Sequence, residues 1–199
     1  MKNSFIFINS IIVFVLFLSI LSEHLRGLND ESIMIDRNIY KSIHNISFLD
    51  IDNNEVTLKE FKNKKILIVN TASNCGYTYQ YEHLQNLHKQ YSDKLIVIGV
   101  PSNDFMGQEP ENEKVIKEFC ESNYGVTFLL TKKMRVRGSR KHELFEYLTN
   151  KKLNGWNDSD PSWNFNKFLI DEEGYLINKF SSSYDPLSNG FLLELLSGS

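Results

Sequence analysis

One of the two cysteines, Cys75, occupies a position suited to nucleophilic chemistry. It follows the apolar run of residues 66–70 and precedes residues 77–91, in which apolar side chains recur at helical spacing. Open α/β sheets place reactive groups where strands end, and free N–H groups at a helix N-terminus stabilise an anion. A cysteine held as a thiolate in this way is reactive near neutral pH. We therefore expect Cys75 to be a nucleophile, with a half-buried structural cysteine as the alternative.

The neighbours of Cys75 exclude two common thiol motifs. Thr78 stands where a Cys-x-x-Cys pair would place its second sulfur, so the dithiol of a thioredoxin is absent. Ala72 stands where a peroxiredoxin carries a threonine three residues before its cysteine. Any chemistry at Cys75 must therefore draw its polar partners from more distant parts of the chain.

Length and composition limit the protein classes that could supply those partners. The chain has 199 residues, of which 41% are hydrophobic and 24% charged, and its net charge is −3. These values fit one globular domain with a short appendage, and a near-neutral charge gives no basis for nucleic-acid binding. Two cysteines are too few for a disulfide-rich scaffold or a zinc ribbon.

Alternating strand and helix patterns predict one α/β domain over residues 40–199. Two apolar runs, residues 66–70 and 95–100, suit buried parallel strands joined by the helix at residues 77–91. The other expected strands lie at residues 47–50, 55–58, 126–130, 164–170 and 175–180, and the other helices at residues 113–124, 142–150 and 186–196. This order predicts a central mixed sheet with helices on both faces, as in the thioredoxin fold. Helix 113–124 is expected to turn Val115, Ile116 and Phe119 inward.

The N-terminal segment differs in kind from the rest of the chain. Residues 1–24 form a hydrophobic leader, with Lys2 ahead of an apolar run and polar residues after it, which is typical of a secretory signal. A short membrane anchor and a buried helix are the alternatives. Residues 25–39 are polar and are expected to be a linker. The leader predicts the secretory pathway or an organelle reached through it, whereas translation from Met34 would give a cytoplasmic product.

Three segments of the chain resemble the glutathione peroxidase family. Residues 69–76, around Cys75, are similar to the active-site segment of that family, and residues 101–110 and 163–170 are similar to its second and third segments. They occur in the order of the family, and the similarity spans about residues 42–196. The resemblance implies a thioredoxin-fold peroxidase that reduces hydrogen peroxide and organic or lipid hydroperoxides with no metal, flavin or nucleotide cofactor.

The same resemblance implies a role for four residues. Cys75 would attack the hydroperoxide and become a sulfenic acid. Gln108 and the indole N–H of Trp163 would donate hydrogen bonds to the thiolate and the peroxide, and Asn164 would be the remaining polar partner of the sulfur. Neutral donors suit this task, because a full positive charge would stabilise the thiolate too far and weaken its attack. Asp104 replaces a common glutamine of the family and would bring a carboxylate towards this pocket.

The second cysteine, Cys120, matches the resolving position of the thioredoxin-dependent branch of the family. This match implies a Cys75–Cys120 disulfide that thioredoxin, or alternatively glutathione, would reduce. Because a disulfide needs Cα atoms within about 4.4–6.8 Å, helix 113–124 would have to open locally. An inert buried thiol is the alternative reading of Cys120.

Two other functions remain open at this point. The protein could be a peroxide sensor that passes its oxidation to a client protein, or a non-catalytic thioredoxin-fold interaction module. The resemblance also implies a monomer, because the chain has little spare length where the tetrameric branch of the family carries an extra surface loop.

Overall fold

The structure is a computed structural model that describes residues 39–197. The leader expected at residues 1–24 and all but the last residue of the expected linker lie outside these residues. Among the helices of residues 39–197, none combines the length and the apolar character that a bilayer crossing requires.

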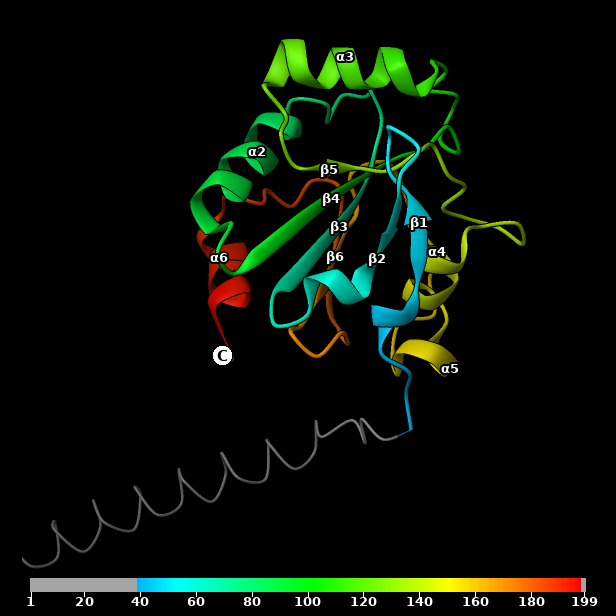
Figure 1. Cartoon of the computed structure of the whole chain (residues 1–199), viewed down its shortest axis with the longest axis vertical. Helices are drawn as coiled ribbons and strands as arrows, with labels where there is room; N and C mark the ends of the chain where they lie inside the picture. Colours follow the sequence, from blue (N-terminus) through cyan, green and yellow to red (C-terminus); the bar gives the residue numbers. More distant parts are fainter. Residues whose placement is uncertain (1–38, 198–199) are drawn as a thin grey trace, which may run out of the picture. The chain divides into compact units, whose positions relative to one another are not determined.

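A five-stranded mixed sheet forms the centre of the domain (Figure 1). The central strand β3 (Lys65–Thr71) pairs in parallel with β4 (Leu95–Pro101), which pairs in parallel with β5 (Leu129–Leu130). On its other side β3 runs antiparallel to β6 (Lys167–Ile170), which pairs with β7 (Leu176–Phe180). The predicted mixed sheet is confirmed, with the order β5-β4-β3-β6-β7.

Helices cover both faces of this sheet. They are α2 (Gln80–Tyr91), α3 (Glu113–Tyr124), α4 (Glu143–Leu148), α5 (Lys151–Asn154) and α6 (Asn189–Leu196). Alternate side chains of β3 enter two separate cores: Leu67 and Val69 pack with α2, α3 and α6, whereas Ile66 and Ile68 pack with α4. Both faces of β3 are buried, which explains why its apolar residues form a continuous run. This packing also fixes the position of the end of the strand.

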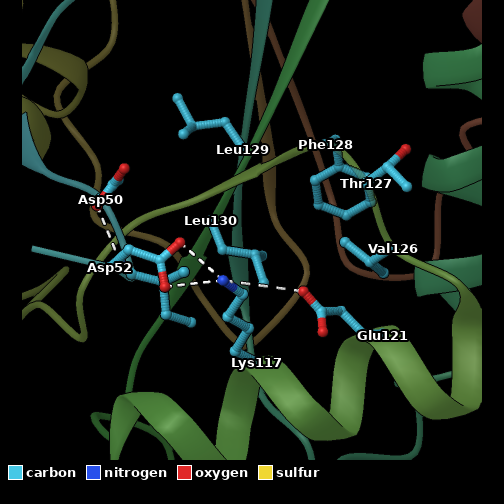
Figure 2. Close-up of a pocket in the computed structure, with 10 residues that line it drawn as sticks. Asp50, Asp52, Lys117, Glu121, Val126, Thr127, Phe128, Leu129 and Leu130 are labelled. Atoms are coloured by element: carbon cyan, nitrogen blue, oxygen red, sulfur yellow. Dashed lines mark hydrogen bonds and ion pairs between the residues drawn. The ribbon is translucent and has the colours of Figure 1, made fainter. Parts of the chain in front are cut away.

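A small hairpin joins the open edge of the sheet to α3. Its strands β1 (Ser47–Leu49) and β2 (Glu55–Thr57) pair antiparallel, as the sequence predicts, and two short 3-10 helices, Ile43–Asn45 and Leu58–Phe61, flank them. Figure 2 shows Lys117 of α3 reaching Asp52 in the hairpin turn, with Nζ 2.7 Å and 2.8 Å from the two carboxylate oxygens.

Several expected elements are shorter in the structure, among them the helix expected at residues 186–196, which forms over Asn189–Leu196. Of the strand expected at residues 126–130 only Leu129–Leu130 forms, since the N–H of Val126 donates to the Cys120 carbonyl and the N–H of Thr127 donates to the side chain of Gln85. The helix expected from residue 77 begins at Gln80, after a turn.

Two expectations about side chains and strand ends also need correction. Val115 is exposed and Phe119 is half-buried, so only Ile116 of the three expected inward residues is fully in the core. The strand expected from residue 164 starts at Lys167, because Phe165 has a φ of 61°, which interrupts the extended backbone.

Gly99 in β4 allows the sheet to pack closely against its neighbours. A Cβ atom added at this position would lie 2.7 Å from Cδ2 of Leu130 and 3.1 Å from Cε2 of Phe128, both core side chains. We expect Gly99→Ala to lower the free energy of unfolding by about 1–3 kcal/mol, measured by denaturant titration. Gly76→Ala is the control, since nothing lies within 4 Å of its added Cβ. Equal stability of the two variants would contradict this account.

Candidate active site

Cys75 lies half-buried in the turn between β3 and α2. Its sulfur accepts the backbone N–H of Tyr77 at 3.5 Å. Thr78 closes the turn: its hydroxyl accepts the N–H of Cys75 at 3.0 Å and donates to the Ala72 carbonyl at 2.9 Å. The backbone donor expected from the helix N-terminus is therefore supplied by the turn that precedes α2, and Thr78 has a structural role at the position of a second cysteine.

Gln108 and Asn164 meet through their carboxamide groups. Nδ2 of Asn164 donates to Oε1 of Gln108 at 2.8 Å. The carbonyl of Gln108 also accepts the N–H of Asn74 at 3.0 Å, so this segment is bound to the residue that precedes Cys75. Because Oε1 is already engaged, the N–H groups of the Gln108 carboxamide remain as its available polar end. Asn164 is fully buried, and its Oδ1 has no hydrogen-bond partner.

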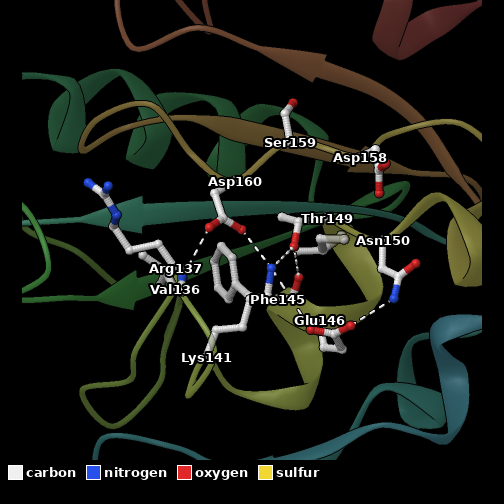
Figure 3. A network of polar contacts seen from close by, with 12 residues as sticks. Val136, Arg137, Lys141, Phe145, Glu146, Thr149, Asn150, Asp158, Ser159 and Asp160 are labelled. Atoms are coloured by element: carbon white, nitrogen blue, oxygen red, sulfur yellow. Dashed lines mark hydrogen bonds and ion pairs between the residues drawn. The ribbon is translucent and has the colours of Figure 1, made fainter.

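Trp163 stands immediately before this buried asparagine. Its ring packs against Phe105, with the ring centroids 5.6 Å apart, and is half-buried. Figure 3 shows Asp160, three residues before Trp163, bound to Lys141, at a distance of 2.6 Å. Asp160 also accepts the N–H of Gly138 at 3.0 Å. The chain that leads into Trp163 is therefore fastened to the loop that precedes α4.

The structure thus brings some of the predicted site residues together. Gln108 and Asn164 share a hydrogen bond, and Gln108 is joined to the turn that carries Cys75. Within residues 39–197, the sulfur receives its hydrogen bond from the N–H of Tyr77 and none from the side chains of Gln108, Trp163 or Asn164. A hydrogen bond from these side chains to the sulfur would need a change in their positions.

Cys120 is fully buried in α3 and has a different environment from Cys75. Burial, as the main cause, raises the pKa of its thiol to about 12, so this thiol is protonated at neutral pH. Both cysteines are free, and both contact the core cluster beneath α2 and α3. The helix ends in a left-handed cap at Gly125, where φ is 59°. The expectation that a disulfide to Cys75 would require α3 to open stays a prediction.

The carboxylate of Asp104 binds groups other than the Cys75 sulfur in this structure. It accepts the N–H of Val136 at 2.7 Å and lies 3.7 Å from Nε of Arg135. The expectation that Asp104 brings a carboxylate to the pocket is therefore corrected: its charge is committed to the loop that follows β5. Groups of three or more acidic, histidine or cysteine side chains arranged for a metal ion are absent from the described part of the chain.

Asn70, near the end of β3, is a site-forming residue that sequence reasoning missed. Its side chain donates to the carbonyl of Trp163 at 2.9 Å and accepts the N–H of Asn166 at 3.0 Å. Its backbone carbonyl accepts the N–H of Phe165 at 2.6 Å, and its N–H donates to the carbonyl of Asn166 at 3.3 Å. The one available signal was a polar residue inside an otherwise apolar strand, since buried polar groups are normally bonded.

Comparison with known proteins identifies the family to which this site belongs. The family model for glutathione peroxidase matches residues 43–149. The glutathione peroxidase homolog BsaA of Halalkalibacterium halodurans is 45% identical over 147 residues, which cover 73% of this chain and 93% of that protein. The hydroperoxy fatty acid reductase of Synechocystis sp. is 41% identical over 153 residues, which cover 73% of this chain and 89% of that protein.

A solved structure agrees with these relatives. The apo crystal structure of Trgpx has a TM-score of 0.60 and 31% identity to this chain, and the match covers 78% of this chain and 94% of that one. With its thioredoxin-type sheet and its half-buried cysteine, the chain belongs to the glutathione peroxidase family. It is a thiol peroxidase of that family.

The Asn70 side chain is expected to hold Trp163 and Asn164 in place. Asn70→Leu keeps a similar volume but leaves the Trp163 carbonyl and the Asn166 N–H without their partner, at a cost of about 1–3 kcal/mol each. Denaturant titration should show this loss. Asn178→Leu in β7 is the control, because that side chain accepts only the N–H of the next residue. An Asn70→Leu variant as stable as the parent would refute the role of Asn70.

Proposed function

We propose that Cys75 is the peroxidatic nucleophile of this thiol peroxidase. The observation that carries the proposal is the position of Cys75. Its half-exposed sulfur accepts a hydrogen bond from a backbone N–H, and its turn is hydrogen-bonded to the Gln108 segment. Its thiolate attacks the distal oxygen of the hydroperoxide, the O–O bond breaks, and Cys75 becomes a sulfenic acid. The leaving alkoxide takes a proton and departs as an alcohol, or as water when the substrate is hydrogen peroxide.

Neutral donors are suited to the oxygen that leaves. The bond from Asn164 to Oε1 of Gln108 orients the carboxamide so that its N–H groups are available, and the indole N–H of Trp163 has no partner in residues 39–197. A small movement of these side chains towards the sulfur would let both donors stabilise the developing alkoxide. Asn164 acts in this proposal by holding Gln108.

Cys120 acts as the resolving cysteine after α3 has opened. Its thiol attacks the Cys75 sulfenic acid, the S–S bond forms, and the sulfenic oxygen leaves as water with the thiol proton. The dithiol of thioredoxin then reduces the disulfide and is itself oxidised. Burial is the main cause of the high pKa of Cys120, so exposure on opening would lower that pKa towards its ordinary value and increase the thiolate fraction.

The rim of the site favours organic hydroperoxides among the substrates. Met106, two residues before Gln108, is 83% exposed, and Tyr79, four residues after Cys75, is 50% exposed. Apolar side chains on both segments offer contact area to an acyl chain. The Synechocystis relative named a hydroperoxy fatty acid reductase supports the inclusion of lipid hydroperoxides.

Replacing each cysteine separates the two chemical steps. Cys75→Ser should abolish peroxide reduction, because the serine hydroxyl is a far weaker nucleophile at neutral pH. Cys120→Ser should leave the first turnover intact and remove steady-state activity with thioredoxin. Stopped-flow reaction with one equivalent of peroxide measures the first step, and NADPH consumption through thioredoxin reductase measures the second.

Thermal unfolding of both cysteine variants verifies that they fold. Activity that survives in Cys75→Ser would overturn the proposed nucleophile. Steady-state turnover that survives in Cys120→Ser would overturn the resolving role. A sulfenic acid that forms normally but passes its oxidation only to a protein thiol other than that of thioredoxin would instead support a sensor, which the greater exposure of Cys75 relative to Cys120 permits.

The cap of α3 provides a test of helix opening. Gly125 has a φ of 59°, and no atom lies within 4 Å of an added Cβ, so Gly125→Ala introduces backbone strain without a clash. A cost of about 1 kcal/mol to the closed helix should speed disulfide formation about fivefold, with the first step unchanged. Gly138→Ala is the matched control, with a φ of 74° and equal space, outside α3. Equal disulfide rates in both variants would exclude opening at this cap.

A further inference from the structure

A buried carboxyl group that the proposed chemistry does not use lies directly beside Gln108. Glu109 has 0% of its surface exposed, and its backbone N–H is held by Oδ1 of Asn103 at 2.9 Å. Its Oε2 accepts the hydroxyl of Ser73 at 3.2 Å, while its Oε1 has no hydrogen-bond partner. A carboxyl group with half of its acceptor capacity unused therefore joins the Gln108 segment to the turn that carries Cys75.

Few positive charges lie near Glu109 to stabilise its ionised carboxylate. Lys133, from the segment after β5, lowers the pKa of Glu109 by its charge, but its ammonium group binds backbone carbonyls, the nearest being that of Glu111 at 2.6 Å. Glu111, on the same segment, acts in the opposite direction. Burial is the largest cause and raises the pKa of Glu109 to about 7, against an ordinary value of 4.5.

The thiol and phenol groups that face Glu109 from the helices are also affected by its charge. Burial is the main reason why the pKa of Cys120 in α3 and of Tyr81 in α2 is raised, and the carboxylate of Glu109 raises both further. Glu109 therefore lies within electrostatic reach of the core beneath both helices. Its link to the turn that carries Cys75 is the hydrogen bond with Ser73.

We propose that Glu109 is a positioning residue of the peroxidase, which holds the Cys75 turn and the Gln108 segment together as a neutral acid and weakens the site when it ionises. The inference rests on the proposed role of Cys75. In the neutral form, the carboxyl group and Ser73 share a hydrogen bond without a buried charge. In the ionised form, the negative charge repels a thiolate in the neighbouring turn and requires solvation that the closed site does not offer.

The pH dependence of the first step tests this role. The rate constant for oxidation of Cys75 by one equivalent of peroxide is measured from pH 5.5 to 9 by titration of the remaining thiol, with no reductant present. In the parent, the rate constant should rise with pH, but less steeply above an inflection near pH 7, where Glu109 ionises. Glu109→Gln keeps the shape and an acceptor for Ser73 but cannot ionise. The ratio of the rates at pH 8 and pH 6 should be at least threefold larger in this variant.

Glu111→Gln is the matched control, an exposed carboxyl group two residues away. Because the charge of Glu111 raises the pKa of Glu109, this variant should keep an inflection, moved only to lower pH. An inflection that persists unchanged in Glu109→Gln would overturn the proposal. The outcome is separate from failure of the proposed function, which would appear as peroxide oxidation that does not require Cys75. Thermal unfolding at each pH verifies folding.

Ser73→Ala provides a second variant in case Glu109→Gln does not fold. The hydrogen bond from Ser73 lowers the pKa of Glu109, so its loss should move the inflection to higher pH. An inflection that stays in place would contradict the proposal. A structural role alone would lower the rate equally at every pH and would not move the inflection.

Discussion

The site depends on a single side chain near the end of the central strand. Asn70 binds the Trp163–Asn166 turn with its carboxamide and with both of its backbone groups, so β3 and the approach to β6 are fixed together. This bonding supports Phe165 in a left-handed conformation, with a φ of 61°, which a bulky residue adopts at a cost. The positive φ of Phe165 interrupts the extended backbone between Trp163 and β6, and the Asn70 side chain binds this turn on both sides of Phe165.

Three chain segments then meet through few bonds. Asn74 binds the carbonyl of Gln108 and Ser73 binds Glu109, while the side chain of Gln108 binds Asn164. Two buried oxygens, Oδ1 of Asn164 and Oε1 of Glu109, are left without partners. Unpaired buried acceptors reduce stability, so their presence in these two segments fits residues that are kept for function and not for packing.

The sequence predicted the elements whose signals are local. Helix α3 occurs at Glu113–Tyr124 as expected, because Asn112 caps its first turn and Gly125 ends it. Strand β3 follows from an apolar run that is buried on both faces. The family resemblance led to Gln108 and Asn164, and the structure shows a hydrogen bond between their side chains. Their predicted role as partners of the sulfur stays a prediction.

The errors arise where distant residues decide the outcome. The N–H of Thr127 binds the side chain of Gln85, 42 residues away, and this removes it from the expected strand. Asp104 is drawn to the loop at Val136 by a hydrogen bond across 32 residues. The role of Asn70 depends on a turn 93 residues further along the chain. Periodicity and turn propensity contain no information on such pairs, because they describe neighbours in sequence.

The contrast between the two cysteines gives the proposed reaction its order. Cys75 is half-exposed and reaches peroxide in the folded state, whereas Cys120 is buried and its thiol has a pKa of about 12. Since burial causes most of that rise, one event, the opening of α3, both frees Cys120 to move and makes its thiol more acidic. In the proposed reaction, opening would therefore increase the thiolate fraction of Cys120, and the stability of α3 would set how long the sulfenic acid persists. A more stable α3 would lengthen that interval and a weaker one would shorten it, so under the proposed reaction the residues that cap this helix would influence the rate of turnover.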